Sequence, residues 1–239
     1  MPTGSDPMSL TRPLVLIAAL LLAAGQAAAQ AQGAEWVSYR DAYRAMVVFE
    51  KYGKPKHLIQ SQLQVVPRTR GVLREGLRLA LEGKSTQLNL ALDATGRTVF
   101  PLLKAAYDDN AALVLDHNIG QFTVRPRVTL AVRADGIYEA AELRDACEQA
   151  LNFARYVEAS ARGLACVGVR FGFGRKGAAP AVRIRNGESA TPLAAVEGPV
   201  FADDPDDGFH TVLVRFADLP AHSQVVTRQA PQAVVPVFE

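Results

Sequence analysis

Two segments of this chain carry apolar residues at helical spacing. The first predicts a helix over 39–52, with apolar positions at Tyr39, Tyr43, Met46 and Val47. Ser38 stands before it as a candidate N-cap, and Gly53 and Pro55 follow its end. The second predicts a longer helix whose apolar positions are Leu143, Ala146, Cys147, Ala150, Ala154, Val157 and Ala161. We expect each helix to lie on a sheet.

Alternation of apolar and polar residues predicts the strands. Within 77–82 and within 87–92 every second residue is leucine, which is the period of a half-buried antiparallel strand, and 93–96 (DATG) indicates a hairpin turn. Further candidate strands are 58–66, 97–100, 111–116, 121–125, 127–133, 164–173, 180–185, 193–201, 209–216, 223–228 and 233–238. Few helices among many short strands predict an α+β fold with antiparallel, sandwich-like sheets.

The two halves of the chain resemble each other at an offset of about 104 residues. Five of fourteen positions are identical between 39–52 and 143–156: Arg40, Asp41, Ala42, Phe49 and Tyr52 match Arg144, Asp145, Ala146, Phe153 and Tyr156. Downstream, the segment from Gly83 aligns with that from Gly187, and 121–125 aligns with 224–228. The offset exceeds the roughly 20 to 50 residues of solenoid units. It predicts two tandem duplicated domains, 32–136 and 137–239, each with one helix packed on antiparallel sheet.

Residues 1–31 have the pattern of a secretory signal peptide. Arg12 precedes an unbroken apolar run over 14–24, and small residues lead to Ala29 and Ala31, where cleavage is expected. The alternative is a membrane anchor, but the run is shorter than the ~20 apolar residues that span a bilayer. We therefore expect a soluble periplasmic or secreted protein with no membrane span after signal cleavage.

The formal net charge of +2 predicts no general binding to polyanions, and nucleic acid is not an expected partner. Basic residues are nevertheless concentrated between 51 and 84. We interpret this basic strip as a candidate binding surface, formed by Lys51, Lys54, Lys56, Arg68, Arg70, Arg74 and Arg78. The alternative is that these side chains protect solvated strand edges from pairing.

The two cysteines, Cys147 and Cys166, predict a disulfide, because an exported chain meets an oxidising environment. The bridge requires the second helix to end early, near Tyr156, or to bend over the sheet. No CxxC pair is present, which argues against a redox role.

Four carboxylates between two predicted strands form a weak candidate calcium site: Asp203, Asp204, Asp206 and Asp207. Asp, Pro and Gly are also ordinary turn residues, and the spacing is not that of an EF-hand.

The four histidines have no metal-ligand spacing, and His117, beside Asp116, is the one histidine next to a carboxylate. No GxSxG motif accompanies that pair. The sequence therefore predicts no catalytic residue, no cofactor and no firm metal site. We interpret the repeated Arg40–Asp41 and Arg144–Asp145 as structural pairs at helix starts.

Three short motifs, GRTVFP over 96–101, DNAALV over 109–114 and NIG over 118–120, resemble exported proteins of Gram-negative bacteria with a signal peptide, a duplicated sandwich-like region and no assigned activity. The resemblance implies a periplasmic location and supplies no site residues. Our functional expectation is a periplasmic binding, accessory or scaffold protein, not an enzyme, with an envelope protein or a glycan as partner. The alternatives are an envelope-polymer hydrolase that uses Asp116 and His117, and a calcium-dependent carbohydrate binder.

Overall fold

The computed structural model describes residues 36–68, 73–205 and 208–239. The predicted signal peptide, Arg70, Asp206 and Asp207 lie outside the described residues. The described chain forms one compact unit with an α+β fold and antiparallel sheets, which confirms the predicted fold class. None of its helices has the length and apolar character needed to cross a membrane.

The elements follow one another in a similar order in the two halves. The first half contains β1 (Trp36–Ser38), α2 (Tyr39–Lys51), β2 (Ile59–Pro67), β3 (Arg78–Glu82), β4 (Gln87–Ala91), β5 (Arg97–Thr98), α3 (Lys104–Asp108), β6 (Ala112–Leu115) and β7 (Phe122–Leu130). The second contains β8 (Ile137–Glu139), α4 (Ala140–Val157), η1 (Ala159–Gly163), β9 (Cys166–Phe173), β10 (Val182–Asn186), β11 (Ser189–Leu193), β12 (Val196–Gly198), β13 (Phe209–Arg215), η2 (Phe216–Asp218), β14 (Gln224–Thr227) and β15 (Ala233–Phe238).

These strands form three sheets. Two four-stranded sheets have the orders β1-β6-β3-β4 and β8-β14-β10-β11, so each strand of one has a counterpart at the same position in the other. The third is a seven-stranded central sheet, β12-β13-β9-β15-β7-β2-β5, to which both halves contribute. The predicted domains 32–136 and 137–239 thus share a sheet. The strand orders of the two four-stranded sheets match, which agrees with a duplication. The duplication itself stays a prediction.

In its downstream part, the sequence alignment matches strands that are not equivalent in the structure. It places 121–125 opposite 224–228, and these segments belong to β7 and β14, which occupy different sheets. The strand that corresponds to β7 by position is β15, since β7 pairs with β2 as β15 pairs with β9. Unequal loop lengths shift the offset after the hairpins.

The helix ends follow the local sequence. The Ser38 hydroxyl accepts a hydrogen bond from the Asp41 N–H at 3.3 Å, so the predicted N-cap of α2 is confirmed. Lys56 Nζ donates to the carbonyls of Phe49 and Glu50 at 2.6 and 2.8 Å and satisfies groups that the last turn leaves unpaired. Helix α4 ends at Val157, as the disulfide requires, and Cys147 and Cys166 are bonded with their Cα atoms 6.0 Å apart. The predicted disulfide is confirmed.

The repeated arginines do not form ion pairs with the neighbouring aspartates. Arg40 donates to the carbonyls of Tyr107 and Asp108 at the end of α3, at 3.0 and 3.1 Å. Arg144 donates in the same way to the carbonyls of Phe216, the first residue of η2, and Leu219, just after η2, at 3.0 and 2.6 Å. Both arginines thus have a structural role, but the expected pairing with Asp41 and Asp145 is wrong. The carbonyls that accept their hydrogen bonds are distant in the sequence, so sequence proximity could not indicate them.

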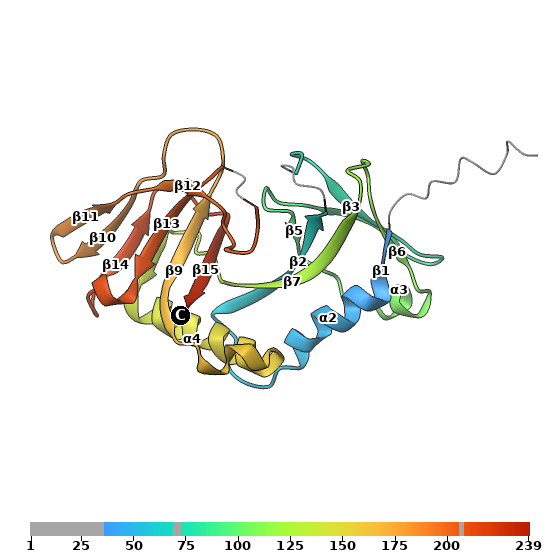
Figure 1. Ribbon diagram of the computed structural model, residues 1–239, viewed down its shortest axis with the longest axis horizontal. Helices are drawn as coiled ribbons and strands as arrows, with labels where there is room; N and C mark the ends of the chain where they lie inside the picture. Colours follow the sequence, from blue (N-terminus) through green and yellow to red (C-terminus); the bar gives the residue numbers. More distant parts are fainter. Residues whose placement is uncertain (1–35, 69–72, 206–207) are drawn as a thin grey trace, which may run out of the picture. The chain divides into compact units, whose positions relative to one another are not determined.

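Helices α2 and α4 lie along the same side of the central sheet (Figure 1). Their C-terminal turns meet in an aromatic cluster of Phe49, Tyr52, Phe153 and Tyr156, in which the Phe49 and Phe153 ring centroids are 5.1 Å apart. These four residues are two of the pairs that the sequence alignment matched. The cluster joins the two halves beside the separate core beneath each helix.

Candidate functional site

A pocket of about 810 Å³ lies between the two long helices and the central sheet. Val48 of α2 and Ala154 and Val157 of α4 line its helical wall, and Val128 of β7 and Phe238 of β15 belong to its sheet wall. The segment 201–203, between β12 and β13, closes another side. The pocket therefore combines elements from both halves, and its lining is mostly apolar.

The central sheet is nearly interrupted between two of the strands that line the pocket. Strands β7 and β15 are joined by a single residue pair, Leu130 with Val234, although each is paired along its other edge. Pro126 and Pro236 lie on these two strands and both line the pocket. The prediction of two strands, 121–125 and 127–133, with a break at Pro126 is wrong. One strand passes through Pro126, because a proline whose nitrogen faces an unpaired edge removes no ladder bond.

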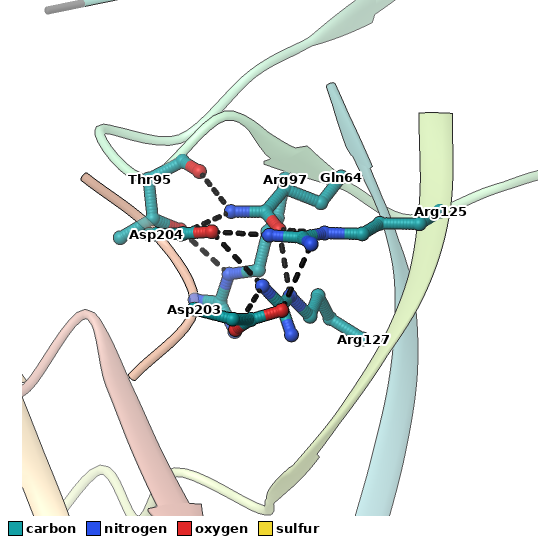
Figure 2. Close-up of polar contacts among 7 residues, drawn as sticks. All are labelled: Gln64, Thr95, Arg97, Arg125, Arg127, Asp203 and Asp204. Carbon is teal, nitrogen blue, oxygen red and sulfur yellow. Dashed lines mark hydrogen bonds and ion pairs between the residues drawn. The ribbon is translucent and has the colours of Figure 1, made fainter. Parts of the chain in front are cut away.

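An ionic cluster lies beside the pocket and joins the two halves; it is formed by Arg97, Arg125, Arg127, Asp93, Asp203 and Asp204, all of which except Asp93 are drawn in Figure 2. Arg127 Nη2 lies 2.6 Å from Asp203 Oδ1 and 2.9 Å from Asp204 Oδ1. Arg125 Nη1 lies 2.8 Å from Asp203 Oδ2, and its other terminal nitrogen contacts Asp204. Three arginines face three aspartates, so the cluster has no formal net charge.

Gln64 connects the members of the ionic cluster. Its Oε1 accepts from Nε of Arg125 and of Arg127 at 3.1 and 2.7 Å, and its Nε2 donates to Asp204 Oδ2 at 2.7 Å. Gln64 is 2% exposed, and the side chains of Arg127 and Asp204 are each 15% exposed. Both the oxygen and the nitrogen of the Gln64 side chain therefore form hydrogen bonds, as polar groups in a buried network must.

Arg97 is the most deeply buried charge of the cluster, at 2% exposure. It donates to Asp93 Oδ2 at 2.9 Å, to Thr95 Oγ1 at 2.7 Å and to the Gln232 carbonyl at 2.6 Å. Burial lowers the pKa of Arg97, and the neighbouring Asp93 opposes that change. The Gln232 contact joins β5 to the segment before β15, which adds a second link between the halves.

The charge state of Asp203 is set by its arginines. Burial raises the pKa of this carboxyl, but the hydrogen bond from Arg127 and the charges of Arg127 and Arg125 outweigh burial and hold the pKa below its usual range. Asp203 is thus ionised at neutral pH, and its charge is compensated from the opposite half of the chain.

This arrangement bears on the calcium prediction. Asp203 and Asp204 are already neutralised by two guanidinium groups, so a cation would have to displace an arginine. Within 36–68, 73–205 and 208–239, no group of three or more potential ligand side chains is placed to hold a metal ion. The calcium site stays a prediction that these contacts do not favour.

The predicted basic strip includes residues on both sides of β2 in the sequence. Lys51, Lys54 and Lys56 lie before β2, whereas Arg68, Arg74 and Arg78 come after it. The nine residues of β2 span roughly 26 Å, at ~3.3 Å per residue, between the segment that holds Lys56 and the segment that begins at Arg68. Lys56 is used to bond the end of α2, and Arg68 donates to Gln121 at 3.2 Å. Lys56 and Arg68 therefore lie at opposite ends of β2, and a binding role for the strip stays a prediction.

The predicted pair Asp116 and His117 does form. His117 Nδ1 lies 3.1 Å from Asp116 Oδ1, which also accepts the Arg78 backbone N–H at 3.0 Å. Burial raises the pKa of Asp116, but the Arg78 and His117 hydrogen bonds outweigh it and lower the pKa overall. In the described part of the chain no serine hydroxyl is hydrogen-bonded to His117, so the hydrolase alternative stays a prediction without a positioned nucleophile.

Comparison with protein-family models, with curated proteins and with solved structures gives no match for this chain. The resemblance to exported bacterial proteins stays a prediction, and the site must be interpreted from its own geometry. Sequence analysis missed both the pocket and the ionic cluster. One signal for the cluster was present in the sequence. Arg125 and Arg127 are two residues apart and so share one face of their strand. On the neighbouring strand Gln60, Gln62 and Gln64 share a face in the same way.

Proposed function

We propose that this chain is an exported binding protein without a catalytic step of its own, and that its ligand occupies the pocket between α2 and α4. The observation that carries the proposal is the size and lining of this pocket. Ligand sites commonly measure about 300–1,000 Å³ and are mostly apolar with a few polar groups. The pocket of about 810 Å³ fits this description.

The position of the pocket supports the proposal. Binding sites occur preferentially at junctions between domains or repeats, and this pocket is lined by α2 and β7 of one half and by α4 and β15 of the other. Arg127 and Asp203 are paired with each other at its border, so neither charge is left without compensation when an apolar ligand excludes water.

An accessory role in the cell envelope belongs to the same proposal. The disulfide between Cys147 and Cys166 is compatible with an oxidising compartment and therefore with a periplasmic or secreted location. A protein or glycan partner would bind at a surface outside the pocket.

The proposal is tested with protein exported from a Gram-negative host, so that processing and disulfide formation take place. Small molecules that co-purify are extracted and identified, and binding of an apolar fluorescent dye is titrated. Ala154→Trp places an indole in the pocket and should reduce dye affinity at least tenfold. Ala141→Trp is the matched control, because Ala141 is an exposed alanine of the same helix outside the pocket. Equal dye binding by wild type and Ala154→Trp would contradict the proposal.

A further inference from the structure

The two strand edges that face each other across the pocket are poor partners for an extended peptide. In an antiparallel ladder, alternate residues turn their N–H and C=O groups away from the paired strand. Pro126 and Pro236 occupy such positions on β7 and β15 and have no N–H to donate. A peptide that paired with these edges would find donors missing on both sides, whereas a hydrocarbon chain needs none.

The interior of the pocket offers hydrocarbon surface. Val48, Val128, Val157 and Phe238 come from four different elements and enclose the space with apolar side chains. Ser61 also lies in the wall, but its hydroxyl oxygen is covered by neighbouring atoms. An apolar chain would gain free energy by leaving water for this surface.

The polar lining residues lie at the opening. Glu158 and Ser160, just beyond α4, are exposed, and the Asp203 side chain is 56% exposed. The positive lining side chain, Arg127, is only 15% exposed and is paired with Asp203. Because Arg125 and Arg127 compensate Asp203, the carboxylate that the opening presents to solvent is that of Glu158. This charge favours a head group that carries an ammonium and disfavours a bare carboxylate or another purely anionic head.

We infer that the pocket holds the acyl chain of a single-chain amphiphile with a zwitterionic head group, the chemistry of a lysophospholipid, an inference that rests on the proposed function. The chain lies between the helices and the split in the central sheet. The ammonium of the head lies near Glu158. An extended peptide and a free fatty acid are the competing occupants that the experiment separates.

The test is calorimetric titration of the exported, delipidated protein with lysophosphatidylcholine below its micelle concentration. We expect saturable one-to-one binding that weakens about tenfold for each two-carbon shortening of the chain. Palmitate should bind at least tenfold more weakly than the lysophospholipid of the same chain length. A valine-rich extended peptide should not compete.

Ala154→Trp should abolish lysophospholipid binding and Ala141→Trp should keep it. Ser160→Trp, at the exposed opening, provides a second blocking variant if Ala154→Trp melts abnormally. Affinity that does not depend on chain length, or stronger binding of palmitate or peptide, would overturn the inference. If such a competitor binds and Ala154→Trp prevents it, the proposed binding function stands while the acyl-chain inference fails. If no lysophospholipid, fatty acid, peptide or dye binds, both fail.

Discussion

Replacing Arg127 by methionine tests whether the ionic cluster holds the two halves together. The substitution removes the guanidinium and keeps an unbranched apolar side chain. Arg127 donates to Asp203, Asp204 and Gln64, at 2.6, 2.9 and 2.7 Å, and lies over the Phe201 ring with its Cζ 4.5 Å from the centroid. The methionine can keep the ring contact and none of the hydrogen bonds.

The expected loss follows from these contacts. A hydrogen bond that involves a charged group contributes about 1.5–3 kcal/mol, and loss of a buried charge partner costs about 3–5 kcal/mol. Arg125 remains beside both carboxylates and compensates part of their charge, so Asp204 is not left alone. We therefore expect Arg127→Met to lower the free energy of unfolding by about 3 kcal/mol. For a domain of this size that corresponds to a Tm about 6–12 °C lower.

The assay is thermal and urea unfolding followed by far-ultraviolet circular dichroism, without reductant so that the disulfide stays intact. Arg68→Met is the matched control, because Arg68 is exposed, its side chain donates to Gln121, and its replacement should change stability by no more than about 0.5 kcal/mol. The Arg127→Met effect should persist in 0.5 M salt, since the Arg127 and Asp204 side chains are mostly shielded. A Tm within about 2 °C of wild type would refute the view that this cluster joins the halves.

Three further predictions concern other contacts. Replacing Cys147 and Cys166 together by alanine should lower stability by about 3 kcal/mol, because the bridge closes a loop of 19 residues; dithiothreitol should then lower the Tm of wild type and not that of the variant. Arg144→Met removes hydrogen bonds to the Phe216 and Leu219 carbonyls and should cost about 2 kcal/mol in urea unfolding; an unchanged midpoint would count against this role. The pKa of Asp203 is lower in the folded than in the unfolded chain, so its contribution is complete above the unfolded pKa of about 4 and is lost as the pH falls through the folded pKa. Asp203→Asn should flatten the dependence of Tm on pH below about pH 5, and identical curves for variant and wild type would contradict the assignment.

Local patterns predicted those features of the fold that depend on neighbours in sequence. The N-cap at Ser38, the strands β3 and β4, and the extent of β15 all follow from helical spacing, capping residues or alternation. The disulfide followed from two cysteines and the expected end of α4. Short elements were predicted less well: α3 was missed, and the predicted strand 193–201 is in fact the end of β11 followed by the three-residue β12.

The candidate site was beyond sequence reasoning because its members are far apart along the chain. Gln64 and Asp204 are separated by 140 positions, and Arg125 and Asp203 by 78. Each looks ordinary in its own segment: a glutamine on a polar strand face, an arginine near a proline, an aspartate in a turn. Only the order of strands in the central sheet brings them together, and that order depends on packing between the halves.

The aromatic cluster has a consequence for how such a chain could arise. Each half contributes an equivalent pair, Phe49 with Tyr52 from α2 and Phe153 with Tyr156 from α4. A polypeptide that held one half alone would expose its pair, and a second copy would offer a self-complementary partner, as in a two-fold symmetric dimer. Fusion through the short segment 131–136 makes this encounter intramolecular, at an effective concentration on the order of millimolar. Assembly then no longer depends on how much protein is present, and each half can change its own wall of the pocket without changing the other.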